Sequence, residues 1–259
     1  MDMSFQLYSG RNTPIAEVLK IAAAAGYKYV EGYGGLDAST KSGLGGLYGD
    51  LETLKAQLDA NGLSMPSAHI GLDLVESPDQ AIKLANALGI KVLICPWLHP
   101  DMRPTDAAGW TAFGKRLAKA AEPLVAAGLT FGYHNHDFEF TKLPDGRFPM
   151  DVLLEAAPNI SIEADIAWIV RGNADPFAWL EKFGQRIVAV HVKDIAPAGQ
   201  NLDEDGWADV GHGKMAWKDL LDLVKTKTTA RYFVAEHDNP SDLTRFATRS
   251  IATVKSFGV

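Results

Sequence analysis

The sequence alternates between short apolar segments and longer amphipathic segments, and it repeats this alternation eight times without a break. Glycine closes several of the helical segments, as at Gly26, Gly62 and Gly89, which is a common way for a helix to end. The expected strands cover residues 5–8, 27–33, 63–70, 91–97, a segment that begins at 129, 160–168, 187–195 and 231–238. The expected helices cover 14–25, 50–60, 77–89, 105–127, 149–157, 176–183, 217–225 and 241–257.

Strands that are apolar on both faces and are separated by helices are typical of a parallel sheet with crossover connections. Eight such units close most economically into an α/β fold of the (β/α)8 TIM barrel type, which usually needs roughly 250 residues. The chain has 259 residues and no Pro/Ser-rich linker, so we expect one domain over residues 1–259 rather than two small ones. A doubly wound open sheet is the competing fold. It is disfavoured because polar residues follow many strands instead of gathering at one switch point.

The charge balance excludes some classes of partner. Lys and Arg number 25 against 32 Asp and Glu, which gives a net charge of −7. An acidic chain repels phosphate backbones and anionic lipid, so we expect neither nucleic-acid nor membrane binding. The N-terminus shows no basic leader followed by an apolar segment, which predicts a soluble cytoplasmic protein. Cys95 is the single cysteine and lies in an apolar run, so we expect a packed core thiol and no disulfide.

The stretch Tyr133-His134-Asn135-His136-Asp137-Phe138-Glu139-Phe140 is unusually rich in side chains that bind metals or carry protons. It follows the apolar run 129–132, which has the pattern of a buried strand. His134 and His136 are two residues apart and would therefore share one face of that strand. This density is difficult to explain by packing alone, so the stretch predicts a functional site.

Ionisable residues also follow most of the other strands, and in a barrel of this kind the carboxyl ends of the strands form the active site. Besides His134, His136 and Glu139, the strand-end residues are Glu31, His69, Glu163, Asp165, His191, Lys193, Glu236 and Asp238. Carboxylates that share one cavity repel each other, so a bound cation is the simplest way to hold them together. Oxygen donors mixed with imidazole suit one divalent ion: Mn²⁺, Mg²⁺, Co²⁺ or Zn²⁺.

Several of these residues also have a structural interpretation. A single strand-end histidine such as His69 is more often a hydrogen-bonded structural residue than a ligand, although His69 could also contact substrate. Glu163 fits equally well as a support for a ligand or as a structural hydrogen bonder. A buried ammonium at Lys193 is costly without a task, yet simple charge balance would also explain it. Trp97 and Trp168 could stack on a sugar or pack at the barrel rim.

The stretches 133–140, Glu163-Ala164-Asp165-Ile166-Ala167-Trp168, His191-Val192-Lys193-Asp194 and Ala235-Glu236-His237-Asp238 together resemble the sugar phosphate isomerase/epimerase superfamily, the xylose isomerase-like TIM barrels. The resemblance covers nearly the whole chain. It also extends to ketose 3-epimerases, inosose dehydratase and 3-oxo-glycoside lyases, and more distantly to endonuclease IV. The acidic charge and the small number of histidines disfavour the endonuclease activity.

The resemblance implies a metal ion held by Asp165, His191, Glu236 and a glutamate of the fifth strand. Many relatives have that glutamate where this chain has His134, so either His134 is the ligand or Glu139 reaches back from the loop; Glu139 is the slightly preferred choice. The implied catalytic residues are His134, His136, Lys193 and Glu236. The expected substrate contacts are Glu31, His69, Trp97, Trp168 and Asp238.

The resemblance implies a metal-dependent isomerase or epimerase that forms an enediolate from a small keto sugar or oxidised sugar. The histidine-rich fifth strand leaves open a lyase or dehydratase that eliminates from a 3-oxo-glycoside or inosose. A sugar-binding barrel without chemistry is the alternative from another class. Few basic residues follow the strands, so we do not expect a phosphate on the substrate. The sequence leaves homo-oligomerisation open.

Overall fold

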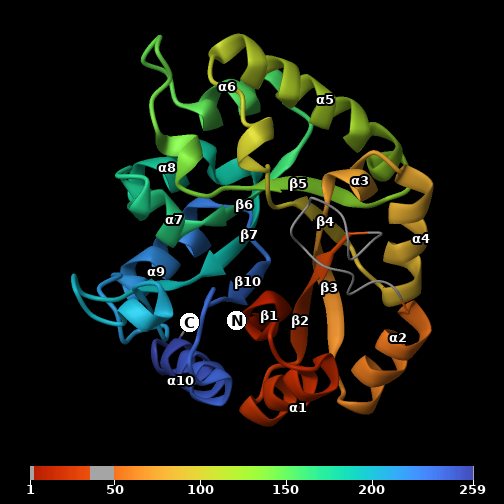
Figure 1. The fold of residues 1–259 in the computed structure, drawn as a ribbon, viewed down its shortest axis with the longest axis vertical. Coiled ribbons are helices and arrows are strands. Elements are labelled where there is room, and N and C mark those ends of the chain that lie inside the picture. Colours follow the sequence, from red (N-terminus) through yellow and green to blue (C-terminus); the bar gives the residue numbers. More distant parts are fainter. Residues whose placement is uncertain (1–2, 36–49, 259) are drawn as a thin grey trace.

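Eight parallel strands close into a single α/β TIM barrel in the computed structural model of the protein, which describes residues 3–35 and 50–258 (Figure 1). Each strand pairs with the next one along the chain, and the last strand pairs with the first. The barrel strands are β1 (Met3–Gln6), β2 (Tyr29–Gly34), β3 (Ser64–Ile70), β4 (Val92–Cys95), β5 (Thr130–His134), β6 (Ser161–Asp165), β7 (Ile187–Val192) and β10 (Tyr232–Ala235).

Helices surround the strands in the order expected for a barrel (Figure 1). The main ones are α1 (Ile15–Ala25), α2 (Leu51–Ala60), α4 (Pro78–Leu88), α5 (Ala107–Ala126), α6 (Pro149–Ala156), α8 (Pro176–Phe183), α9 (Trp217–Lys227) and α10 (Leu243–Ser256). Two shorter helices, α3 (Leu72–Val75) and α7 (Ile166–Arg171), follow β3 and β6 directly. No helix within the described parts of the chain is long and apolar enough to cross a membrane.

Local sequence signals explain where the helices begin and end. The carboxylates of Asp50 and Asp106 accept hydrogen bonds from the third backbone N–H beyond them, and so cap α2 and α5. Gly26 ends α1 with a φ of 96°, a backbone conformation that glycine adopts without strain. These caps lie at the ends that the sequence predicts, so the helical half of the fold follows closely from local chemistry.

Five expected strands end earlier than the sequence pattern indicates, among them the fourth at Cys95 and the eighth at Ala235. The first ends at Gln6, and residues 7–10 form a 3-10 turn. The sixth ends at Asp165, because the carboxylate of that residue caps α7 instead of continuing the sheet. The seventh ends at Val192, and β8 (Asp194–Ile195) pairs antiparallel with β9 (Trp207–Ala208) outside the barrel.

The two faces of the barrel strands carry different chemistry near the carboxyl ends. Phe5 is fully buried and packs against Tyr27, which lies between α1 and β2, and against Phe246 of α10. The next residue, Gln6, is also fully buried, but it hydrogen-bonds Glu31 across the strand pair. The barrel interior near the carboxyl ends of the strands therefore contains polar side chains, which would be costly to bury without hydrogen-bond partners.

Candidate functional site

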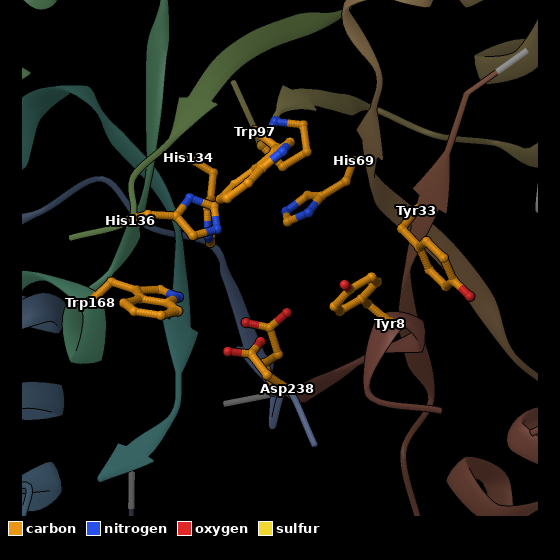
Figure 2. Close-up of a pocket in the computed structure, with 10 residues that line it drawn as sticks. Tyr8, Tyr33, His69, Trp97, His134, His136, Trp168 and Asp238 are labelled. Carbon is orange, nitrogen blue, oxygen red and sulfur yellow. The ribbon is translucent and has the colours of Figure 1, made fainter. Parts of the chain in front are cut away.

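A cavity of about 240 Å³ opens at the carboxyl ends of the strands. Figure 2 shows the side chains around it, with His134 and His136 on one side and Tyr8 and Tyr33 on the opposite side. The lining residues are Tyr8, Tyr33, His69, Pro96, Trp97, His134, His136, Trp168, Glu236 and Asp238. The cavity thus combines aromatic walls with acids and imidazoles, the lining expected of a small-molecule site.

Three potential ligand side chains meet beside this cavity. Asp165, His191 and Glu236 each offer one donor atom, and these atoms lie within 4.8 Å of one another. All three side chains are buried, with at most 6% of their surface exposed. Nδ1 of His191 lies 2.9 Å from Oε2 of Glu236 and 3.9 Å from Oδ2 of Asp165. This is the trio that the family resemblance implies as metal ligands.

The backbone around Asp165 fixes its carboxylate. Oδ1 accepts the backbone N–H of Trp168 at 2.9 Å, which caps α7. Asn135 accepts the N–H of Asp165 at 3.1 Å and donates its amide to the carbonyl of Asp165 at 3.0 Å. The second oxygen, Oδ2, is buried and has no hydrogen-bond partner. One carboxylate oxygen is therefore held rigidly, and the other remains available to a ligand.

A second group of side chains lies beside the first and shares His191 with it. His69, His134, Glu163 and His191 each offer a donor atom within the same 4.8 Å limit. Oε2 of Glu163 lies 2.5 Å from Nε2 of His69, 3.0 Å from Nδ1 of His134 and 3.1 Å from Nε2 of His191. One carboxylate oxygen thus connects three imidazoles.

Lys193 is completely buried among acids. Its ammonium lies 2.6 Å from Oδ1 of Asp238, 3.1 Å from Oε2 of Glu236 and 3.8 Å from Oδ2 of Asp165. It also lies 4.3 Å from the ring centre of Trp207, a favourable cation–π distance. The surrounding acids raise the pKa of Lys193 despite its burial, so the ammonium stays charged.

The imidazoles divide into charged and neutral groups. Burial opposes protonation of His69, but the carboxylates of Glu163 and Glu31 raise its pKa to about 9. Burial likewise opposes protonation of His191, and Glu163 and Glu236 raise its pKa well above the ordinary value. Burial holds the pKa of His134 well below the ordinary value, and nearby cationic groups lower it further. His134 is therefore neutral at physiological pH.

His136 is neutral for related reasons. Its ring lines the cavity, and burial together with the charge of Lys193 holds its pKa well below the ordinary value. Nδ1 of His136 is buried without a hydrogen-bond partner. A neutral imidazole with an uncommitted nitrogen can accept a proton from a bound molecule.

The acids are also tuned by their surroundings. Burial raises the pKa of Asp165 to about 7, and the charges of Lys193 and His191 oppose this rise. Burial also acts to raise the pKa of Glu236, but Lys193 and His191 overcome this effect and hold it well below the ordinary value. Glu236 is thus ionised at neutral pH, whereas Asp165 lies near its titration point. A divalent ion beside Asp165 would favour the ionised form.

The donors present fit a divalent metal ion. Two carboxylates and an imidazole converge, and the partnerless Oδ2 of Asp165 lies in the same group. Oxygen and nitrogen donors without sulfur suit the hard and borderline divalent ions. His134 is a candidate for a further donor, because it shares the neighbouring group with His191, as His69 and Glu163 also do.

Glu139 does not join the other three expected ligands. It is fully buried on the short 3-10 turn Phe138–Phe140, and its oxygens accept hydrogen bonds from the Tyr133 hydroxyl at 2.6 Å and the His136 backbone at 2.9 Å. It belongs to neither of the groups of converging donor atoms among the described residues. The geometry thus favours His134, the other option that the sequence left open for the fifth strand.

Of the five expected substrate contacts, four line the cavity and one does not. His69, Trp97, Trp168 and Asp238 line the cavity. Glu31 does not: it is fully buried below the cavity and bonds Gln6 and His191. The sequence patterns did not single out Gln6, Tyr8, Tyr33 or Asn135. The available signal was an aromatic residue near the carboxyl end of each of the first two strands, Tyr8 just after β1 and Tyr33 within β2, and their rings pack edge to face at 5.2 Å.

A closed barrel that carries acids and imidazoles at the carboxyl ends of its strands is typical of α/β-barrel proteins with a small-molecule site at that end. A family model described as xylose isomerase-like TIM barrel matches residues 19–255. The chain belongs to the xylose isomerase-like TIM barrel family. No curated protein matches the sequence.

Three solved structures with the same fold are similar over nearly their whole length. A sugar phosphate isomerase/epimerase from Parabacteroides distasonis has a TM-score of 0.78 and 20% identity, covering 98% of this chain and 97% of that one. The probable 3-DHS dehydratase AsbF from Bacillus anthracis has a TM-score of 0.72 and 15% identity, with coverages of 98% and 99%. The IolI protein, solved with a zinc atom, has a TM-score of 0.69 and 15% identity, with coverages of 100% and 97%. At these identities the similarity shows the fold alone.

Proposed function

We propose that the protein is a divalent-metal-dependent isomerase or epimerase that removes a proton from the carbon next to the carbonyl of a keto sugar. The observation that carries this proposal is the convergence of Asp165, His191 and Glu236 beside a cavity lined by the neutral imidazoles of His134 and His136. The family includes solved sugar phosphate isomerase/epimerases, and a relative of the same fold, IolI, was solved with zinc.

Asp165, His191 and Glu236 would hold the ion, with His134 as the further donor or as a proton carrier. When bound, the ion would polarise a sugar carbonyl and offset the negative charge that develops as the neighbouring carbon loses its proton. The candidate ions are Mn²⁺, Mg²⁺, Co²⁺ and Zn²⁺, and metal analysis of the purified protein would distinguish them.

The chain supplies the proton carriers on its own. His134 and His136 are neutral and can accept the proton at an imidazole nitrogen. Glu236 is ionised and lines the same cavity, so it can carry a proton at another edge of the sugar. Lys193 is held by Asp238 at 2.6 Å, where its charge can stabilise a developing enediolate.

The cavity walls suit an uncharged sugar. Trp97, Trp168 and Tyr8 present aromatic surfaces on which the C–H groups of a sugar ring can pack. Glu236 and Asp238 contribute negative charge, and no arginine is among the described residues that line the cavity. We therefore expect a substrate without phosphate.

Elimination from a 3-oxo-glycoside or a related ketone is the second candidate. The observation that favours it is the orientation of Glu139 toward Tyr133, because Glu236 is then the one glutamate among the described residues that line the cavity, and His134 lines it as well. An imidazole would take the proton, and Lys193 could give a proton to the departing oxygen. A probable dehydratase is among the relatives of the same fold.

Incubation in D₂O with ketoses, inososes and 3-oxo-glycosides separates these reactions. Deuterium incorporated beside the carbonyl without loss of a group supports isomerisation, whereas release of water or an alcohol supports elimination. Absence of exchange with every substrate in the presence of each candidate metal would leave the sugar-binding barrel as the remaining interpretation.

Metal analysis tests the ligand set independently. We expect Asp165→Ala, His191→Ala and Glu236→Ala to lose bound metal after dialysis against a limited metal supply. Glu204→Gln, which changes a buried acid outside this site, should retain the wild-type content. Full metal content in all three alanine variants would exclude the shared site.

A further inference from the structure

The two ring nitrogens of His191 face different acids. Nδ1 lies toward the proposed ligands, 2.9 Å from Oε2 of Glu236 and 3.9 Å from Oδ2 of Asp165. Nε2 lies 2.8 Å from Oε1 of Glu31 on the other side of the ring. The ring is thus placed between the proposed metal site and an acid that does not line the cavity.

Glu31 reaches His191 across the barrel. It belongs to β2, whereas His191 belongs to β7, and β1 and β10 separate these strands in the sheet. Both side chains are fully buried, so water does not compete for their hydrogen bond. The contact joins two opposite parts of the wall at the level of the site.

A third residue fixes Glu31. Gln6 is the register partner of Glu31 on β1, and its amide donates to the same oxygen, Oε1, at 2.7 Å. The Gln6 side chain is also completely buried. Its donated hydrogen bond orients the carboxylate, so Oε1 presents itself to the imidazole as an acceptor.

Glu163 is a weaker candidate for the same task. Its Oε2 lies 3.1 Å from Nε2 of His191, but 2.5 Å from Nε2 of His69. His69 is therefore its nearest imidazole. For Glu31 the order is reversed, because His191 at 2.8 Å is nearer than His69 at 3.2 Å.

We propose that Glu31 is a positioning residue that holds the metal-bound form of His191 with its proton on Nε2, so that the lone pair of Nδ1 faces Asp165 and Glu236. A neutral imidazole donates from one nitrogen and accepts with the other, so a carboxylate at Nε2 selects this tautomer. Metal-binding histidines commonly have such a carboxylate partner. The inference rests on the proposed metal site and assigns to Glu31 a role other than the expected substrate contact.

The affinity for Zn²⁺, measured by competition with a chromophoric chelator, tests this role in the purified full-length protein. We expect Glu31→Gln to bind Zn²⁺ roughly 10- to 100-fold more weakly than the wild type, because the neutral amide is a poorer acceptor and can flip to present its donor. The matched control is Asp209→Asn, which changes another buried acid to its amide at a place where the acid pairs with Arg245 and Arg249. Its affinity should stay within about twofold of the wild type.

The outcomes separate the two proposals. If the wild type binds no divalent ion, the proposed function fails and the role of Glu31 fails with it. If the wild type binds and Glu31→Gln binds equally well, only the role of Glu31 is overturned. Equal weakening in Asp209→Asn would likewise overturn it, because the effect would then not be specific to the His191 contact.

A second measurement reads the tautomer of His191 directly in the wild type. Long-range ¹H–¹⁵N spectra of the zinc-loaded, histidine-labelled protein report the tautomer of each imidazole. We expect His191, assigned by the loss of its signals in His191→Gln, to carry its proton on Nε2 and to bind through Nδ1. Ligation through Nε2 would overturn the proposal, even if the zinc affinity of the wild type is high.

Discussion

The ammonium of Lys193 lies 3.1 Å from Oε2 of Glu236, the same oxygen that Nδ1 of His191 approaches to 2.9 Å. It also lies 3.8 Å from Oδ2 of Asp165, the carboxylate oxygen that has no hydrogen-bond partner. A protein cation thus compensates the carboxylates at the proposed metal site. Lys193 and a divalent ion would compensate the same negative charge, which couples stability to metal binding.

Replacement of Lys193 by methionine should make stability more dependent on metal. Removing one partner from a buried ion-pair group costs about 3–5 kcal/mol, so the free energy of unfolding of the metal-free variant should fall by this amount. Addition of Zn²⁺ or Mn²⁺ should then raise its melting temperature more than that of the wild type. Differential scanning calorimetry with and without metal measures both effects.

The control for this prediction is Lys182→Met, which removes an ammonium paired with Asp151 at the surface. Its side chain is 54% exposed, so its loss should change the free energy of unfolding by less than about 1 kcal/mol. An equal metal-induced rise in melting temperature for Lys193→Met and the wild type would contradict the coupling.

His134 and Glu139 should respond differently to truncation. In Glu139→Ala the buried hydroxyl of Tyr133 and the N–H of His136 lose their acceptor, which costs about 1–3 kcal/mol of stability, while metal content is retained. His134→Ala should instead reduce deuterium exchange into substrate by about 10²- to 10⁴-fold. Urea unfolding, metal analysis and exchange rates measure the two sets of effects. Loss of metal from Glu139→Ala to the same extent as from Asp165→Ala would restore Glu139 as the ligand.

Much of the fold could be predicted because its signals are local. The apolar segments, the capping carboxylates such as Asp106 and the helix-ending glycines such as Gly89 act within a few residues, so the barrel follows from their repetition. The confirmed family and barrel also place the strand-end residues at one mouth. Asp165, Glu236 and Asp238 could therefore be assigned to the same region without knowledge of any distance.

The end of the seventh strand and the position of Glu139 could not be predicted from the sequence, because both depend on contacts with other segments. Asp194 accepts hydrogen bonds from the backbone of Gly211, Gly213 and Met215, which moves the chain out of the barrel after Val192. No local pattern encodes that turn. In the same way, the 3-10 turn Phe138–Phe140 directs the Glu139 side chain back to the hydroxyl of Tyr133. The periodicity of the preceding strand does not predict this turn.

Cys95 should be unreactive in the folded protein. It is fully buried, and burial raises the pKa of its thiol to about 12, so the thiolate is scarce at pH 8. Ellman's reagent at pH 8 should release no thionitrobenzoate from the native protein and one equivalent after unfolding in guanidinium chloride, because the chain has one cysteine. Rapid modification under native conditions would show that this part of the core opens.

Glu204, which is not one of the proposed metal ligands, should make stability depend on acid pH. Its carboxylate accepts hydrogen bonds from Ser241 and Arg245 and so ties the 3-10 turn Leu202–Glu204 to the start of α10. Burial opposes ionisation, but these hydrogen bonds and the charge of Arg245 lower the pKa to about 2. Because the folded-state pKa is depressed, the stabilisation is fully present above the unfolded pKa of roughly 4.3 and is lost as the pH falls toward 2.

The comparison of wild type with Glu204→Gln isolates this contribution from the other acids. At pH 7 the variant should lose about 1–3 kcal/mol, because Arg245 and the backbone N–H of Ser241 face a weaker acceptor. The difference between the two proteins should shrink as the pH falls from about 4.3 toward 2, because protonation removes the same charge from the wild type. Urea unfolding at pH 7, 4 and 3 gives the three differences. A difference that stays constant would mean that the ionised carboxylate contributes nothing, and that the variant acts through shape alone.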